Sequence, residues 1–174
     1  MTSVKTIRMG FLTAEDRLVM DFVGADHTVT MLVTRRIVRR VIQGLAQILV
    51  QSSPVLPRVP ASHKTDMLVW EHLSALQPGE EVTAGDAAAT PGHAEHPWQL
   101  LNKLDINAHP TSFQLRFEGL DGSPVVMVMS RNEVHRLLAN LRKLARHAEW
   151  DIDTEVGWLV EADAPQMQTG ILAS

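Results

Sequence analysis

Arginine is concentrated in two stretches whose apolar residues recur at helical spacing. Guanidinium groups donate paired hydrogen bonds from a planar fork, which suits phosphates and carboxylates. A groove between two such helices would hold an anionic partner such as nucleic acid, and added salt would weaken that binding steeply. Two other interpretations stay open: a solvated helix face, or arginines covered by the acidic segments of the same chain. The candidate residues are Arg35, Arg36, Arg39, Arg40, Arg131, Arg136, Arg142, Lys143 and Arg146.

A second candidate for binding is an apolar patch near the C-terminal end of the sequence. Trp158, Leu159 and Val160 stand among acidic residues, and no Lys or Arg follows Trp150. A Trp side chain is a strong anchor in a partner's pocket. The patch therefore predicts a docking peptide, with packing on its own domain, or addition as a strand at the sheet edge, as equal alternatives.

No residue pattern typical of catalysis, metal binding or a resident cofactor stands out. Cys is absent, which removes thiolate nucleophiles and thiolate metal ligands. The histidines and one nearby glutamate are the remaining candidates: His63, His72, His93, Glu95, His96, His109 and His135. Metal ligands need a rigid framework, and the Gly/Ala/Pro-rich stretch around His93 predicts none. We expect no metal, no cofactor and no catalytic activity, and keep open an enzyme whose site forms from distant residues.

Composition is that of an ordinary globular protein. The chain has 174 residues, 45% of them hydrophobic and 21% charged, with a net charge of −4. This balance gives no overall attraction to nucleic acid or to acidic membranes. No apolar run approaches the roughly 18 residues that span a bilayer, and Met1–Lys5 lacks the apolar core of a signal peptide. We expect a cytoplasmic protein that does not act at membranes.

The elements that must position these residues are strands followed by a helix. Residues 6–12, 17–23 and 28–33 alternate between apolar and polar side chains, which predicts three strands of an antiparallel meander. Thr34 is placed to cap a helix, whose apolar stripe runs from Val38 to Leu49. Ser52-Ser53-Pro54 ends that helix, because Pro disfavours helical geometry in the residue before it.

The same order of elements recurs between residues 102 and 145. Leu104 falls on Met9, and Phe117 falls on Phe22. Further coincident positions follow the same comparison: Met127 on Met31, Arg131 on Arg35, Arg136 on Arg40 and Leu141 on Leu45. Chance alignment of two strand–helix units is the alternative, but the matching turn and cap positions favour an internal duplication.

The sequence thus predicts a two-layer α+β fold built from a duplicated βββα unit. We expect a mostly antiparallel sheet of about six strands, or two packed three-stranded sheets, with pseudo-twofold symmetry. Predicted divisions are a first repeat over 1–53, a connection over 54–100, a second repeat over 101–150 and an acidic tail over 151–174. Within the connection, 66–76 is expected to be a short helix, and 77–97 is rich in Gly, Ala and Pro, which is typical of a mobile loop.

In element order the chain is similar to the Whirly and PUR-repeat proteins, which also duplicate a meander-plus-helix unit. The resemblance implies binding of single-stranded nucleic acid across the sheet, where bases stack on aromatic side chains. Here Phe11, Phe22, Phe113 and Phe117 fall on the inward face, and Tyr is absent. The outward face therefore has no stacking platform.

These observations favour a non-enzymatic binding or adaptor protein that acts through protein–protein contacts. It would use the sheet edges, the basic helices and the acidic tail, as one chain or as part of a larger assembly. A nucleic-acid-binding protein is the alternative, followed by an enzyme with a cleft between the repeats.

Overall fold

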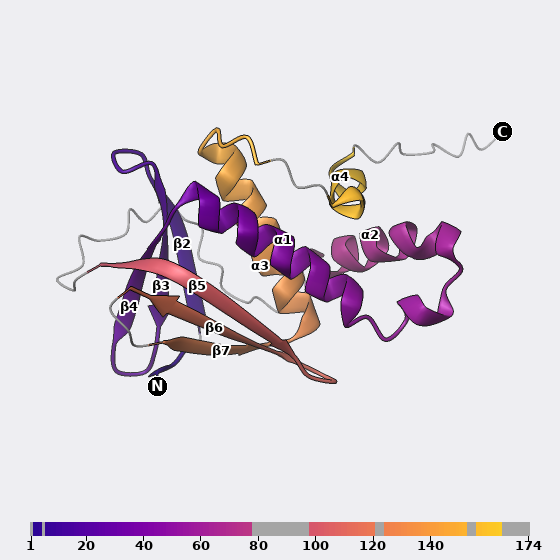
Figure 1. The fold of residues 1–174 in the computed structure, drawn as a ribbon, viewed down its shortest axis with the longest axis horizontal. Coiled ribbons are helices and arrows are strands. Elements are labelled where there is room, and N and C mark those ends of the chain that lie inside the picture. The colour runs from indigo at the N-terminus through magenta and orange to yellow at the C-terminus, as the bar shows by residue number, and fades with distance from the viewer. Residues whose placement is uncertain (1, 5, 78–97, 121–123, 153–155, 165–174) are drawn as a thin grey trace.

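Three antiparallel strands followed by one long helix make up the first part of the fold (Figure 1). They are β2 (Thr6–Leu12), β3 (Arg17–Val23), β4 (Thr28–Val33) and α1 (Arg35–Gln51). The computed structural model describes residues 2–4, 6–77, 98–120, 124–152 and 156–164. The strand–strand–strand–helix order predicted from the sequence is confirmed here.

The same succession follows in the second part of the chain. Its elements are β5 (Gln99–Ala108), β6 (Phe113–Gly119), β7 (Val125–Met129) and α3 (Arg131–His147). The fold therefore contains two βββα runs and belongs to the α+β class.

Shorter elements flank the two runs. A two-residue strand, β1 (Thr2–Ser3), precedes β2. Two 3-10 turns (Leu56–Arg58 and Ala61–His63) lead into α2 (Lys64–Ala75), which is the helix expected in the connection. The stretch after α3 contains α4 (Gly157–Asp163), a helix that is not predicted from the sequence. Most of the loop expected over 77–97 lies outside the described residues.

All strands belong to one sheet in the order β1-β7-β6-β5-β4-β3-β2. Neighbours within each run are antiparallel, whereas β4 pairs with β5 in parallel and β1 pairs with β7 in parallel. The sheet is thus mostly antiparallel and continuous, not two separate sheets. Because only Val4 and Lys5 separate β1 from β2 in the chain, the two ends of the strand order meet, and the sheet curls into a barrel-like shape.

Each long helix begins where its sequence supplies a cap. The Thr34 hydroxyl accepts from the Ile37 amide at 3.4 Å. Ser130 and Glu133 form a reciprocal capping box, in which the Ser130 hydroxyl accepts from the Glu133 amide at 3.3 Å and the Glu133 carboxylate accepts from the Ser130 amide at 2.6 Å. Such caps satisfy amides that have no partner inside the helix.

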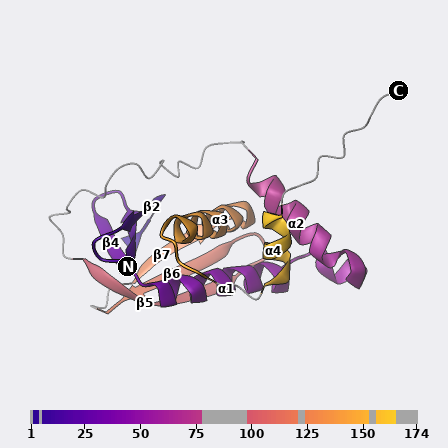
Figure 2. The same cartoon turned by 90° about the horizontal axis from the view of Figure 1, so that it is seen from above.

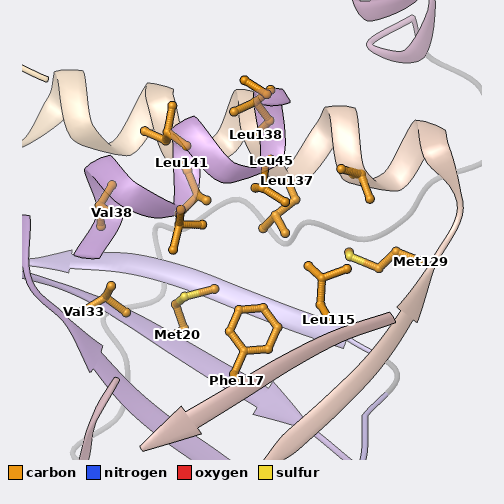
Figure 3. Packing of buried hydrophobic residues seen from close by; sticks show 14 of the residues in the cluster. Met20, Val33, Val38, Leu45, Leu115, Phe117, Met129, Leu137, Leu138 and Leu141 are labelled. Atoms are coloured by element: carbon orange, nitrogen blue, oxygen red, sulfur yellow. The ribbon is translucent and has the colours of Figure 1, made fainter. Parts of the chain in front are cut away.

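The two long helices lie side by side over the inner face of the curled sheet (Figure 2). Apolar side chains from both helices point toward the sheet, and those of Met20, Leu115 and Phe117 point back toward them (Figure 3). Phe22 and Phe117 meet at the centre of this core with ring centroids 4.7 Å apart. The predicted inward faces are confirmed, since Phe22, Phe113 and Phe117 are buried and Phe11 is half-buried.

The end of α3 is tied back to the first hairpin. The Trp150 Nε1 atom donates to the Asp16 carboxylate at 2.7 Å, and the Trp150 ring meets Phe11 edge-on at 5.8 Å. Asp16 has a φ of 48°, a left-handed conformation that Asp tolerates better than most residues. This contact fixes the chain after α3 against the β2–β3 turn.

Among the described residues, no helix is long and apolar enough to cross a membrane.

Leu45 lies fully buried between the two long helices and the sheet. Leu45→Ala should lower the free energy of unfolding by about 2–5 kcal/mol, because it removes buried methyl groups and leaves a cavity. Urea unfolding measures the change. Gln47→Ala on the exposed side of the same helix is the control, for which we expect a change within about 0.5 kcal/mol. Equal effects at both positions would contradict this account of the core.

Candidate functional site

Many of the basic residues singled out in the sequence make contacts within the molecule. Arg35 and Arg39 both donate to the Asp151 carbonyl, at 2.7 Å and 3.4 Å. Arg142 and Arg146 both pair with the Asp163 carboxylate. Arg36, Arg40 and Lys143 are exposed and make no ion pair or side-chain hydrogen bond with the described part of the chain. The basic faces are therefore partly used to hold the segments that follow α3.

Arg131 joins three elements at the start of α3. Its guanidinium forms an ion pair with Glu71 of α2, with a second contact to the same carboxylate at 3.1 Å. It also donates to the Leu49 carbonyl at 2.5 Å and to the Ser52 hydroxyl at 3.0 Å, both at the end of α1. Arg136 donates to the Ala75 carbonyl at 2.8 Å. Both arginines of α3 thus fix α2 to the helical layer.

The apolar patch of the tail packs on its own chain. Trp158 and Leu159 are buried, whereas Val160 is 61% exposed. The Arg142 guanidinium donates to the Leu159 carbonyl at 3.3 Å, next to its ion pair with Asp163. In this arrangement the candidate docking residues form α4, which lies against α2.

A buried pair of histidines lies beneath α4. His72 of α2 is 4% exposed and His135 of α3 is 0% exposed, and their Nδ1 atoms are 3.0 Å apart. The Trp158 ring meets both imidazoles at steep angles, with centroid distances of 5.5 Å and 6.1 Å. On its other side, the His135 Nε2 atom faces the Glu71 carboxylate at 3.5 Å. Glu71 therefore lies between Arg131 and His135.

This geometry allows one hydrogen bond between the two imidazoles. The facing carboxylate favours a hydrogen on Nε2 of His135, which leaves Nδ1 of His135 to accept from Nδ1 of His72. A second hydrogen between the two Nδ1 atoms would clash at this distance.

Burial and charge set the protonation of this cluster. Burial, reinforced by His135 and Arg142, lowers the pKa of His72 from 6.5 to about 4. Burial alone would raise the pKa of Glu71, but interactions with His135 and Arg131 outweigh it and bring that pKa from 4.5 down to about 2. Glu71 is thus held ionised and His72 is held neutral near pH 7.

The cluster was missed in the sequence because its members lie 63 residues apart. Both histidines are among the metal-ligand candidates of the sequence, but no local pattern links one to the other. The part of the chain that the structure describes holds no group of three or more His, Cys, Asp or Glu residues that could bind a metal ion. His93, Glu95 and His96 lie outside the described residues, and so does any site they form.

A mostly apolar cavity lies where β2 and β7 separate. β1 pairs with β7 at Val125 and Val126 only, and from there the chain continues into β2 and away from β7. A cavity of about 260 Å³ occupies the gap between the two strands and α3. Its walls are mostly apolar, with polar groups on the α3 side; they include Ile7, Met9, Leu76, Met127, Met129, Leu137, Glu133, Arg136 and Asn140.

We call this place the β2/β7 seam. On that side of β7, Met127–Met129 have no strand partner among the described residues, and β2 pairs only with β3. The seam therefore offers two unpaired strand edges on either side of an apolar cavity. Val128, which is 66% exposed, also lines this cavity.

A second, smaller cavity of about 190 Å³ lies between α1 and β5. It is lined by Arg40, Val41 and Gly44 of the helix and by residues of the strand that include Asn102 and Leu104. Both cavities thus lie between a long helix and the first strand of the other βββα run.

Stability should depend on pH through His72 and Glu71. The lowered pKa of His72 means that the unfolded chain binds more protons between about pH 6.5 and 4, so unfolding becomes easier as pH falls through that window. The lowered pKa of Glu71 acts in the same direction between about pH 4.5 and 2. Each of the two pKa shifts should lower the free energy of unfolding by on the order of 3 kcal/mol at most. Urea unfolding from pH 7 to pH 3 measures this loss.

His72→Gln should flatten the decline between pH 6.5 and 4, because Gln does not titrate. Gln47→Ala, an exposed change that alters no titratable group, is the control and should keep the wild-type slope. A wild-type slope in the His72 variant would contradict the lowered pKa of His72.

Comparisons with protein-family models, with curated proteins and with solved structures found no match to this chain.

Proposed function

We propose that this chain is a non-enzymatic cytoplasmic binding protein that acts by adding an extended strand of a partner protein at the β2/β7 seam. Unpaired backbone N–H and C=O groups along a strand edge are complementary to another strand. The observation that carries the proposal is the pairing of β7 with β1, which stops after Val126 and leaves an apolar cavity between β7 and β2.

The lining of the cavity indicates what the added strand would present. Met9, Met127 and Met129 contribute flexible thioether side chains, which adapt to apolar groups of different shape. Side chains of a strand alternate between its two faces, so every second residue of the partner would point inward. The partner segment should therefore carry a large apolar residue for the cavity and polar residues on the face beside the exposed Arg8.

The proposal includes an origin by duplication, with the two βββα runs related by a pseudo-twofold axis. Phe22 and Phe117 are equivalent in the sequence comparison and contact each other, as residues beside a twofold axis do. Strand register supports the same relation. In the first junction, Met31 pairs with Gln99. Their equivalents are Met127 and Val4, and one further step of the β1–β7 register would bring these two residues side by side.

The two cavities also correspond under this relation. Met9 and Arg136 line one, and their equivalents Leu104 and Arg40 line the other. The larger cavity lies at the seam between the two ends of the sheet, where β2 has no second strand neighbour in the described sheet. The smaller one lies beside β5, which pairs with β6 but with β4 only at Gln99 and Leu100, so Leu104 has no partner on the β4 side either among the described strands. The duplicated unit thus supplies a matched internal control.

Met9→Trp should fill the seam cavity and lower partner recovery at least tenfold, since its indole would occupy the space of the partner's apolar side chain. Leu104→Trp places the same side chain at the equivalent position of the smaller cavity and should leave recovery unchanged. A tagged chain is used for affinity capture after nuclease treatment, with the recovered protein measured by quantitative mass spectrometry.

Thermal unfolding of both Trp variants establishes that each is folded. In hydrogen exchange, the bound partner should slow exchange of β2 amides and leave the β3–β4 turn unaffected. Recovery that is equal for the two variants, or no protein recovered by the wild-type chain, would rule out strand addition at the seam.

Nucleic-acid binding by the paired basic helices is the alternative function. The exposed Arg36 and Arg40 favour it, because neither has an ion pair within the described residues. Their neighbours Arg35 and Arg39 hold the Asp151 carbonyl, so the basic surface open to a ligand is smaller than the sequence indicates.

If the chain binds nucleic acid, the Arg36→Ala/Arg40→Ala double variant should elute from a single-stranded DNA column at clearly lower salt than the wild-type protein. The reason is that fewer phosphate contacts release fewer counterions. This pair spares the two arginines that bind Asp151. Arg58→Ala, an exposed change outside both long helices, is the control. Elution of the double variant at the wild-type salt concentration would end the nucleic-acid alternative.

A further inference from the structure

Helix α4 fills a groove formed by α2 and α3. Its Trp158 side chain lies over the buried His72–His135 pair, and Leu159 is completely buried beside it. Figure 1 shows α2 and α4 together at the end of the helical layer that lies away from β2–β4. The groove therefore accepts one aromatic and one aliphatic side chain from a single helical turn.

The charge of the groove specifies an acidic occupant. Arg142 has only 12% of its side chain exposed and pairs with Asp163 of α4, and Arg146 reaches the same carboxylate at 3.1 Å. A largely buried guanidinium without a carboxylate partner is strongly unfavourable. Any segment that replaces α4 must bring an acidic group to the same point.

Several features of α4 weaken its packing in the groove. It has seven residues, and no side chain caps its N-terminus at Val156. The Trp158 Nε1 atom is buried without a hydrogen-bond partner in the described structure, which is unfavourable for the docked helix. Val160 stays largely exposed. These features favour a segment that exchanges with a competitor.

We propose that the α2/α3 groove is a docking site for a short helix of a partner protein that carries a Trp-Leu pair and a carboxylate about one and a half turns later. α4 fills this groove in the absence of the partner and so competes with it. The site is separate from the β2/β7 seam, and its failure would leave the strand-addition proposal untouched.

The test uses the full chain and a fluorescein-labelled peptide of residues 156–164 as the probe. Trp158→Ala/Leu159→Ala removes the two buried side chains of α4 and should open the groove. Fluorescence anisotropy should show at least tenfold tighter peptide binding to this variant than to wild type, because apparent affinity scales with the fraction of molecules whose groove is open. Val160→Ala, at the exposed position of α4, should bind the peptide as wild type does.

A charge exchange tests the acidic contact. The peptide with Asp163→Lys should bind the opened variant at least tenfold more weakly. Arg142→Glu/Arg146→Glu, added to the opened variant, should reverse this preference so that the Lys peptide binds better than the original. Indifference of the opened variant to the sign of this charge would overturn the proposal, as would absence of peptide binding up to millimolar concentration.

Hydrogen exchange of the wild-type chain gives a second measurement that does not depend on the variants folding. Amides of α4 should exchange at least a hundredfold faster than buried-face amides of α3, because α4 leaves the groove without global unfolding. Added peptide should not slow α4 exchange, since it competes for the groove. Exchange of α4 at the rate of α3 would show that α4 is a fixed part of the core and would overturn the proposal.

Discussion

Neither βββα run can bury its own apolar sheet face, and the rest of the structure depends on this constraint. Three strands and one helix form too small a core to be stable alone. In the full chain, α1 and α3 lie together on the inner face of a single curled sheet. Phe22 from one run packs on Phe117 from the other. Association of the two runs is thus a condition of folding, and the chain is expected to unfold as one unit.

Because α1 and α3 pack side by side, Arg131 at the start of α3 lies close to the end of α1 and to Glu71 of α2. Helix α2 rests on α3 through Glu71, whose carboxylate lies between the Arg131 guanidinium and the His135 imidazole. A buried ion pair is weak evidence for stability by itself, because desolvation opposes the attraction. The Glu71–Arg131 pair does, however, fix the position of α2 on α3. With Glu71 and Arg131 in place, His72 is brought against His135, and the groove that receives Trp158 is formed.

Prediction from sequence succeeded wherever a local pattern decides the structure. Alternation in 6–12 and 17–23, the Thr34 cap and the stripe from Val38 to Leu49 depend on neighbours in the chain, and all are found. The pairing of His72 with His135 depends on how α2 packs on α3, which no local pattern encodes. The same holds for β1, two residues long, and for α4, whose Trp-Leu pair was equally compatible with a partner's pocket or a strand. The sequence shows where basic residues are concentrated, but it does not show that four of them contact Asp151 or Asp163. Both of these residues follow α3 in the chain and reach the arginines only through tertiary folding.

The curled sheet explains why the cavity lies at the β2/β7 seam. A sheet that closes completely leaves no edge, but this one must also admit two helices on its inner side. β1 therefore pairs with β7 over two residues, after which β2 diverges from β7 beside α3. The cavity is a direct result of covering one sheet with two helices, and Met side chains line it because they pack against irregular space. A partner strand at this position would extend the pairing that β1 begins, without requiring the core formed by α1, α3 and the sheet to rearrange.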